Sequence, residues 1–321
     1  MTPNSSLFPD QEDIVVNILH MLEVSGRSSF SKLDIARLGV FVKTFDPNDK
    51  DFLASKQCLF KPISKEDIKL WKISAAEAAV VRNNLDIPDL GPVSQHRPTW
   101  NITVATQQVF HFIMAQFLFR RRGKTSLRDT FGWNGIDHEE FYDGNKGFLH
   151  SPSGRCKGAD TPGWRTCLLE EWWDGEILAG PSVRFIVCTD GIAEEDSLLL
   201  SELGAVAQVI AFRRTQPEFQ TFLLFPVLMI SLFGPRHGRI VQACYDRRGD
   251  RLELRISQIF CFANRSDAEF DTFVRFTASY PPEIANPTFF TSLQIILNDG
   301  CLASDPSQDW EILSNITLEN Q

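Results

Sequence analysis

The chain has 321 residues, of which 43% are hydrophobic and 23% charged, a balance that excludes a largely disordered protein. Its formal net charge of −9 arises from 32 basic and 41 acidic residues. This excess of acid argues against binding to nucleic acid, because contact with the phosphate backbone needs concentrated Lys and Arg. The longest apolar run, at residues 222–233, contains Pro226 and is far shorter than the ~20 residues of a membrane helix, so no membrane partner is expected.

The cysteines favour a reducing compartment. They are odd in number and scattered, and Cys188, Cys244 and Cys261 fall in predicted strands, where buried reduced thiols are the natural interpretation. Residues 1–13 also lack the charged-then-apolar pattern of a secretion signal. We therefore expect an intracellular protein, cytoplasmic or nuclear, and not a secreted one.

Helices are predicted in the first half of the chain at residues 10–24, 75–85 and 103–122. The first repeats apolar side chains at the i, i+3, i+4 spacing of an amphipathic helix. The second begins with Ser74 and Glu77, which have the spacing of a capping box. The third ends in Arg120-Arg121-Arg122 before Gly123, where cations favour the helix dipole.

A proline-rich connector at residues 86–98 suggests a boundary. We expect a smaller N-terminal α/β lobe at residues 1–90 and a main α+β domain at residues 99–321. The lobe either packs on the main domain or is part of it.

Residues 131–175 differ in composition from the rest, because they are dense in Gly, Asp and Trp. They predict an insert of loops and short hairpins, too long for a simple connection and therefore either functional or a covering flap. Large aromatic side chains on loops are typical of partner-binding hot spots. This makes four residues candidates for binding a protein partner: Trp133, Trp164, Trp172 and Trp173. The alternative is that they pack the insert over the sheet.

The second half of the chain predicts the core of the fold. A strand at residues 183–189 and a helix at residues 193–214 precede three strands within residues 222–262, and a helix follows at residues 266–279. The three strands are joined by short turns and must be antiparallel, because a parallel crossover needs a dozen or more residues. The expected fold class is α+β, a mostly antiparallel sheet with this three-stranded meander, covered by helices.

The order of helix, three strands and helix resembles the core of the PD-(D/E)XK nucleases. In that family an Asp and an acid-x-Lys pair on neighbouring strands bind a divalent cation. The resemblance implies catalytic roles for Asp246, Glu253 and Arg255, with Mg²⁺ as cofactor. The acid from the preceding helix is Glu202, or alternatively Glu194 or Glu195. Arg255 replaces the Lys and cannot deprotonate in a protein. The alternative is that these are turn and surface residues, with no cofactor.

Two further patterns suggest ligand sites. Arg236 and His237 lie in a Gly-flanked turn that could hold an anion, although a turn with a surface-exposed Arg and His is the favoured interpretation. Four potential zinc ligands fall in or near the insert: His138, His150, Cys156 and Cys167. They lack the paired spacing of zinc knuckles, so they are weak candidates.

The stretch from Phe225 to Ala243, FPVLMISLFGPRHGRIVQA, resembles a stretch found in uncharacterised proteins of filamentous fungi. The resemblance covers roughly residues 183–281 and implies a fungal, intracellular origin. It transfers no activity and no residue role. Because no strong catalytic spacing is present, the sequence favours a non-enzymatic interaction or accessory protein with a protein partner, and a divergent metal-dependent nuclease is the alternative.

Overall fold

The structure is a computed structural model that describes residues 13–84, 99–136, 147–151, 163–262 and 267–283. The chain divides into one unit of residues Met1–Ile284 and a second of residues Ala285–Gln321. The second unit lies outside the described residues. The described part contains no helix with the length and apolar character needed to cross a membrane.

The helices, in chain order, are α1 (Ile14–Ser25), α2 (Lys32–Arg37), α3 (Lys50–Ala54), α4 (Lys65–Ile68), α5 (Ala75–Asn84), α6 (Thr99–Phe119), α7 (Leu200–Thr215) and α8 (Asp267–Thr277). The strands are β1 (Ser29–Ser31), β2 (Phe41–Phe45), β3 (Lys61–Pro62), β4 (Arg121–Arg122), β5 (Thr125–Ser126), β6 (Trp133–Gly135), β7 (His150–Ser151), β8 (Trp164–Asp174), β9 (Ile177–Thr189), β10 (Ser197–Leu199), β11 (Leu224–Phe233), β12 (His237–Asp246), β13 (Arg251–Ser257), β14 (Phe260–Cys261) and β15 (Ser279–Tyr280).

Among the described residues, nine strands form one sheet in the order β2-β13-β12-β11-β9-β8-β6, with β14 beside β12 and β7 beside β8. The β9–β11 and β13–β2 pairs are parallel, and the other pairs are antiparallel. The α+β class is therefore confirmed, whereas the expectation of a mostly antiparallel sheet is met only in part. The two parallel pairs join segments far apart in sequence, which turn signals cannot reveal.

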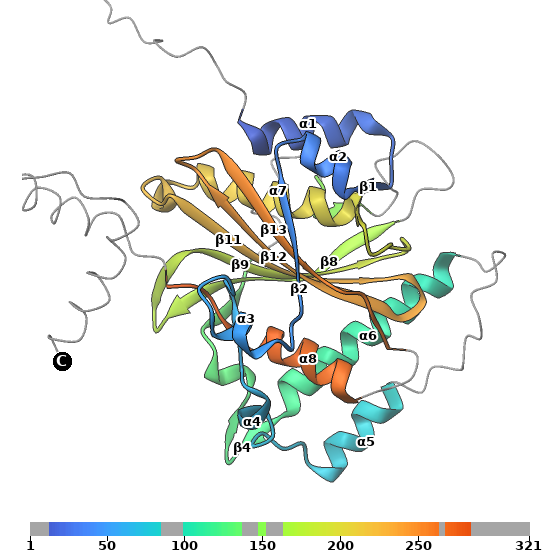
Figure 1. The fold of residues 1–321 in the computed structure, drawn as a ribbon. Coiled ribbons are helices and arrows are strands. Elements are labelled where there is room, and N and C mark those ends of the chain that lie inside the picture. The colour runs from blue at the N-terminus through green and yellow to red at the C-terminus, as the bar shows by residue number, and fades with distance from the viewer. Residues whose placement is uncertain (1–12, 85–98, 137–146, 152–162, 263–266, 284–321) are drawn as a thin grey trace, which may run out of the picture. The chain divides into compact units, whose positions relative to one another are not determined.

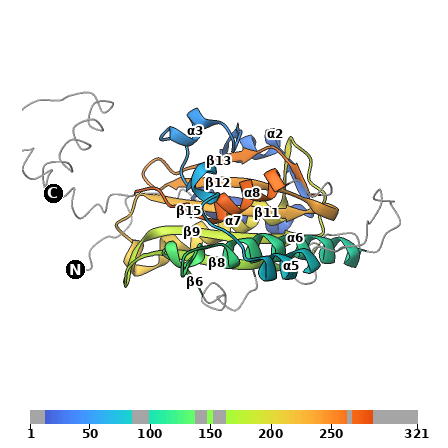
Figure 2. The same ribbon diagram turned by 90° about the horizontal axis from the view of Figure 1, so that it is seen from below.

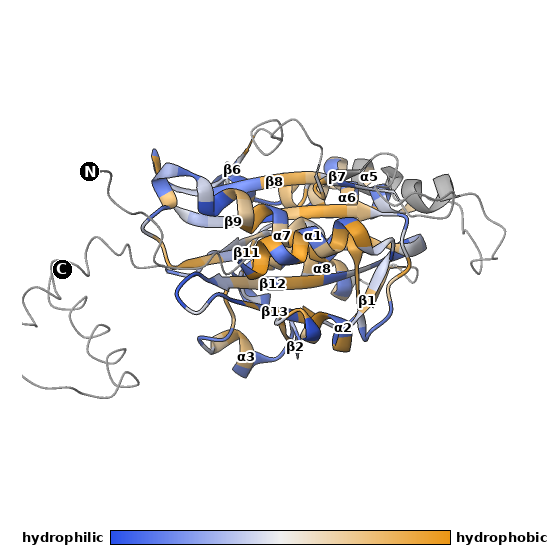
Figure 3. Ribbon diagram, turned by 90° about the horizontal axis from the view of Figure 1, so that it is seen from above, coloured by the Kyte–Doolittle hydropathy of each residue, from blue (hydrophilic) through white to orange (hydrophobic). Residues whose placement is uncertain are grey.

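Helices cover both faces of this sheet (Figure 1). One face, which we call the α7 face, carries α7 with α1 packed on its outer side; Figure 3 views this face. The opposite face, the α6 face, carries α6 and α8, which lie in front of the strands in Figure 2. Alternate strand residues supply the two cores: Val227 and Met229 point to the α7 face, and Leu228 and Ile230 point to the α6 face.

The meander predicted within residues 222–262 is present as β11, β12 and β13. Its last strand ends at Ser257, and the separate β14 pairs with the start of β12. The helix expected at 193–214 begins only at Leu200, because residues Ser197–Leu199 form β10 and pair with β1. The helix expected at 103–122 ends at Phe119, and Arg121 and Arg122 form β4 instead.

The description of residues 131–175 as loops and short hairpins was wrong for residues 164–174, which form β8, a long strand inside the sheet. A bulge hides this strand from pattern analysis. Trp164 and Leu169 both contribute to the core of the α7 face although they are five residues apart, because the register shifts between Thr166 and Leu168. Such a shift breaks the period of two that identifies a strand.

The N-terminal segment is built into the same unit as the sheet. β2 pairs with β13 at the sheet edge, and β1 pairs with β10 ahead of α7. The carboxylate of Asp13 accepts the Val15 N–H at 2.9 Å and caps α1, whose residues Val15 and Ile18 are fully buried in the core of the α7 face.

Candidate functional site

A group of aromatic side chains gathers where β6 and β8 meet β15 at one edge of the sheet. Trp133 and Trp172 are register partners on β6 and β8, with ring centroids 5.2 Å apart. The ring of Tyr280 lies 5.8 Å from Trp172 and 4.8 Å from Phe131. We call Phe131, Trp133, Trp172 and Tyr280 the aromatic edge cluster. Edge-to-face and tilted contacts of this kind stabilise aromatic pairs beyond the area that they bury.

The cluster runs from the protein core to its surface. Trp133 is 3% exposed and donates its indole N–H to the Ser279 carbonyl oxygen at 2.7 Å, so it belongs to the core. Trp172 is half-buried, and Tyr280 is 47% exposed. The outer rings are therefore presented to solvent while their inner neighbours hold them in place.

Arg184 on β9 supports the base of the cluster. Its guanidinium lies 4.8 Å from the ring centroid of Trp133 and 5.1 Å from that of Phe117 on α6. It also pairs with the fully buried Glu170 of β8 at 2.6 Å, and Arg128 approaches the other oxygen of that carboxylate at 3.4 Å. Burial lowers the pKa of Arg184, and Glu170 opposes that effect. This cation therefore fixes Trp133 from within the core.

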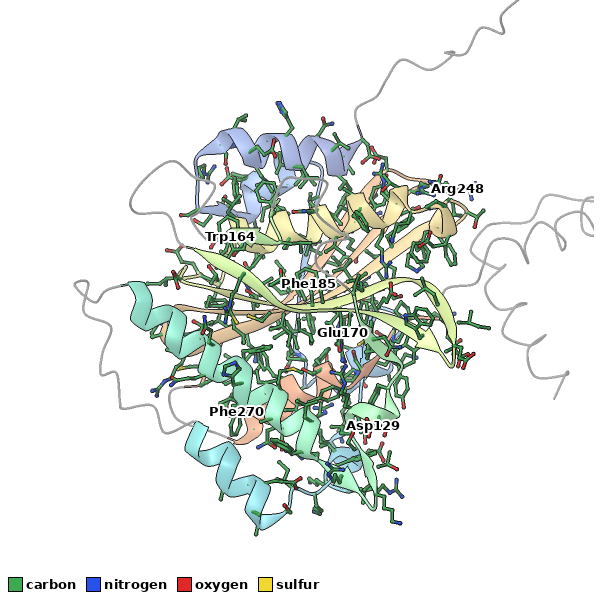
Figure 4. The ribbon with its side chains drawn as sticks, turned by 180° about the vertical axis from the view of Figure 1, so that it is seen from behind. Asp129, Trp164, Glu170, Phe185, Arg248 and Phe270 are labelled. Carbon is green, nitrogen blue, oxygen red and sulfur yellow. The ribbon has the colours of Figure 1, made fainter. Side chains whose placement is uncertain are left out.

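Trp164 and Trp173, also expected at a binding surface, lie outside the aromatic edge cluster. Trp164 is 5% exposed, packs in the core of the α7 face and donates its indole N–H to the Phe148 carbonyl oxygen at 2.7 Å. Figure 4 shows Trp164 on the side of the sheet nearer α7, and Glu170 on the side of α6. Trp173 is half-buried and donates to the Glu171 carboxylate at 2.9 Å. Only Trp133 and Trp172 of the four join the aromatic edge cluster.

Arg236 and His237 lie at the far end of the meander, where β11 turns into β12. Arg236 is 8% exposed, and its carbonyl oxygen accepts the Phe262 N–H at 2.8 Å. His237 pairs in register with Phe233 and Cys261, and burial lowers its pKa. Thr106 of α6 donates its hydroxyl to the Gly234 carbonyl oxygen at 3.3 Å in the same turn. The turn is thus packed against α6 rather than held out as a surface loop.

The four residues of the nuclease hypothesis divide between the two sheet faces. Asp246, Glu253 and Arg255 face the α6 side, because the residues that alternate with them, such as Tyr245 and Leu254, are in the core of the α7 face. Glu202 lies on α7, on the opposite side. A carboxylate there cannot share an ion with Glu253.

Glu202 already has a complete set of partners. The Arg239 guanidinium binds both of its carboxylate oxygens, with the Arg239 Nε to Glu202 Oε1 distance at 2.7 Å, and both side chains are fully buried. Glu202 also accepts the Leu199 N–H at 2.7 Å, which caps α7. These contacts give Glu202 a structural role, joining the start of α7 to β12.

Glu253 is likewise surrounded by cations. Its carboxylate lies 3.2 Å from Lys43, 3.5 Å from Arg251 and 2.7 Å from Arg255. Asp246 accepts the Arg248 N–H at 2.9 Å within the turn after β12. Both carboxylates therefore have ordinary structural partners.

The zinc hypothesis involves residues that are only partly within the described chain. His138 and Cys156 lie outside the described residues. His150 on β7 pairs in register with Arg165 of β8, and Cys167 lies at the β8 bulge. Across the described ranges, no three His, Cys, Asp or Glu side chains are grouped so that they could hold a metal ion.

Cys167 and Cys188 form a pair of thiols on the neighbouring strands β8 and β9. A hydrogen bond with Cys188 lowers the pKa of Cys167 to about 7, and burial raises the pKa of Cys188. Both belong to the α6 face. The bulge brings them together, because it turns Cys167 to the face that Cys188 already occupies.

No family model matches this chain, and no match was found among curated proteins or solved structures. Functional conclusions therefore rest on the geometry alone. Sequence analysis missed Tyr280, the most exposed ring of the aromatic edge cluster. Its one visible signal is its place directly before Pro281-Pro282, where a helix cannot continue and the chain returns to the surface.

Proposed function

We propose that this chain is a non-enzymatic protein of the cell interior that binds a partner protein through the aromatic edge cluster. The observation that carries the proposal is the contact of the half-exposed Tyr280 with Trp172, whose other neighbour is the buried Trp133. Tyr and Trp are the residue types enriched at the energetic centres of protein interfaces.

The arrangement suits binding because its entropic cost is small. Large rings with two side-chain torsions lose little freedom on binding, and here they are already held by packing before a partner arrives. The inner contacts of Trp133 with Arg184 and with the Ser279 carbonyl oxygen fix the base of the cluster. A partner segment with apolar side chains would therefore meet a rigid surface.

The test compares proteins that bind to the immobilised full chain and to its variants. Tyr280→Ala and Trp172→Ala remove the outer rings, and Leu33→Ala removes a 62% exposed apolar side chain elsewhere as a matched control. Quantitative mass spectrometry of proteins bound from an extract is expected to show at least one protein that the wild type and Leu33→Ala bind and that both ring variants lose. The proposal is refuted if every protein that binds the wild type also binds Tyr280→Ala and Trp172→Ala to the same extent.

The alternative is a divergent metal-dependent nuclease that uses Asp246, Glu253 and Arg255. They share one sheet face, and Glu253 is opposite Cys244 in the β12–β13 pair. Hydrolysis of nucleic acid by the purified chain with Mg²⁺, lost in Glu253→Gln, would replace the binding proposal. Glu202→Gln cannot serve in this assay, because it disrupts the core.

A further inference from the structure

A pocket of about 240 Å³ lies between α4, α8 and the chain that leads into α3. Lys65, Ile68 and Lys69 form one wall, Asn48 and Phe260 contribute at the sides, and α8 supplies the rest through Ala268, Glu269, Asp271, Thr272 and Arg275. Water occupies about 30 Å³ per molecule in the liquid. The space therefore suits a ligand that replaces about eight waters, smaller than a drug-sized molecule.

Arg275, which lines this pocket, has a buried donor without a protein partner. The side chain is 2% exposed, and its Nε donates to the Ile63 carbonyl oxygen at 2.7 Å, which fixes the guanidinium plane. Its Nη1 is buried and makes no hydrogen bond. Buried donors without partners are costly, so such a group in a pocket wall points to a ligand or to ordered water.

Glu269 places a buried acceptor in the same pocket. Its Oε2 is buried and makes no hydrogen bond. Glu269, Thr272 and Arg275 are spaced i, i+3, i+6 along α8, so they lie on one side of the helix and line the pocket together. The pocket thus has an unused donor and an unused acceptor on one wall.

The charges around the pocket favour an anion. Three cations line it, Lys65, Lys69 and Arg275. Of its two acids, Asp271 is bound by Arg120 at 2.6 Å, so its charge is already opposed. Burial lowers the pKa of Arg275, and the nearby Glu66 and Asp271 only oppose that effect, so a bound anion would stabilise the charged guanidinium further.

We propose that this pocket binds a small organic phosphate or carboxylate that also carries a hydroxyl or amino group. The planar guanidinium of Arg275 binds the anionic oxygens, Lys65 and Lys69 add charge from the exposed side, and Glu269 accepts the hydrogen bond of the hydroxyl or amine. A plain inorganic anion satisfies only the first two requirements. The site is separate from the aromatic edge cluster and does not depend on the function proposed for it.

The test uses the full chain with sn-glycerol 3-phosphate, inorganic phosphate and uncharged glycerol as probes. Thermal unfolding and titration calorimetry are expected to show saturable binding of glycerol 3-phosphate at millimolar concentrations or below, weaker binding of phosphate and none of glycerol. Lys65→Gln combined with Lys69→Gln is expected to weaken glycerol 3-phosphate binding by about tenfold, the effect of one lost charge-assisted hydrogen bond. Lys32→Gln combined with Arg37→Gln changes the net charge equally on α2, on the other side of the sheet from the pocket, and is expected to leave binding unchanged.

Two variants separate the pocket from a general salt effect. Arg275→Lys keeps the charge and removes the planar pair of donors, so weaker binding of glycerol 3-phosphate is expected. The ligand-free variant is also expected to be less stable, because the bond from Nε to the Ile63 carbonyl oxygen is lost, so binding is measured well below its unfolding temperature. Glu269→Met has no acceptor oxygen for the ligand's hydroxyl, so it is expected to remove the preference for glycerol 3-phosphate over phosphate. The proposal is overturned if no probe binds, if the Lys65 and Lys69 double variant binds glycerol 3-phosphate as the wild type does, or if the control double variant weakens binding to the same extent.

Discussion

The carboxylate of Asp250, in the turn between β12 and β13, accepts the backbone N–H of Ile14 at 3.2 Å, although the two residues are 236 positions apart. The same carboxylate accepts the Tyr245 hydroxyl at 3.0 Å, and that hydroxyl lies 3.1 Å from Asp13. Asp250 thereby joins the first turn of α1 to the sheet. Its φ of +43° lies in the left-handed region, which side chains other than Asn and Asp rarely adopt.

Substitutions at Asp250 are expected to separate the contribution of its carboxylate as a hydrogen-bond acceptor from that of its left-handed backbone conformation. Asp250→Ala loses the acceptor and retains the strained backbone, so we expect the free energy of unfolding to fall by about 2 kcal/mol. Asp250→Gly loses the same acceptor but relieves the backbone, so its loss is expected to be smaller by about 1 kcal/mol. Urea unfolding of the two variants measures the difference. Equal losses would mean that the backbone at this turn is not strained.

The buried pair of Glu202 and Arg239 leads to a second prediction. Glu202→Gln leaves a fully buried guanidinium without its counter-charge. The free energy of unfolding is therefore expected to fall by about 3–5 kcal/mol relative to the wild type. Replacing both residues by Met removes both charges together and is expected to be much milder. Glu218→Gln, at an exposed position, is the matched control and is expected to change stability by less than about 0.5 kcal/mol.

Urea unfolding again provides the measurement, and it also tests the role assigned to Glu202. A folded Glu202→Gln variant with wild-type stability would contradict the structural role. It would reopen the possibility that this carboxylate serves a chemical purpose.

Local chemistry in the sequence predicts the helices well. The capping box expected from Ser74 and Glu77 is present, with the Ser74 hydroxyl 2.6 Å from the Glu77 carboxylate and the Glu77 N–H 3.2 Å from the Ser74 hydroxyl oxygen. Gly26 follows the predicted helix at residues 10–24 closely and has a φ of +63° at the C-cap of α1. These signals act over three or four residues, so the sequence contains all the information that they need.

Contacts between segments far apart in the chain could not be predicted from the sequence. Nothing near β2 reveals that it pairs in parallel with β13, in a register that joins Phe41 to Glu253. Glu170 lies in the segment predicted as loops and Arg184 in a predicted strand, yet the two pair with each other inside the core. The α4–α8 pocket likewise forms only when segments around residues 48, 65 and 270 meet. Each of these features depends on distant residues whose contact leaves no local pattern.

Two glycines near β6 give a matched pair for a third prediction. A Cβ at Gly132 would lie 1.9 Å from the Trp173 backbone oxygen, whereas a Cβ at Gly135 would have nothing within 4 Å. Gly132→Ala must therefore push β6 away from β8, which we expect to cost about 3 kcal/mol in unfolding free energy. Gly135→Ala is expected to change stability by less than about 0.5 kcal/mol.

Because β6 carries Trp133, the same pair of variants tests the aromatic edge cluster. Gly132→Ala is expected to shift tryptophan fluorescence as β6 moves away from Trp172, and Gly135→Ala is expected to leave the spectrum unchanged. If Gly132→Ala has wild-type stability and fluorescence, the close approach of β6 and β8 is not present in solution.

The last prediction concerns the reactivity of Cys167. A hydrogen bond with Cys188 lowers the pKa of Cys167 to about 7, while burial raises the pKa of Cys244 to about 12. Since the thiolate is the reactive form, the Cys167 labelling rate rises with pH through this value, and alkylation is expected to be half-maximal near pH 7. Cys244 is expected to stay unlabelled across the neutral range.

Mass spectrometry of the iodoacetamide-treated folded protein measures both sites, in a background where Cys156, Cys261 and Cys301 are replaced by Ser. Cys188→Ala removes the hydrogen-bond donor, so the midpoint for Cys167 is expected to rise toward the ~8.5 of an unperturbed thiol. Cys58→Ala, which removes a buried thiol near Gln242 of β12, is the control and is expected to leave the midpoint for Cys167 unchanged. A wild-type midpoint already near that of a free thiol would show that the β8 bulge does not bring the two sulfur atoms together.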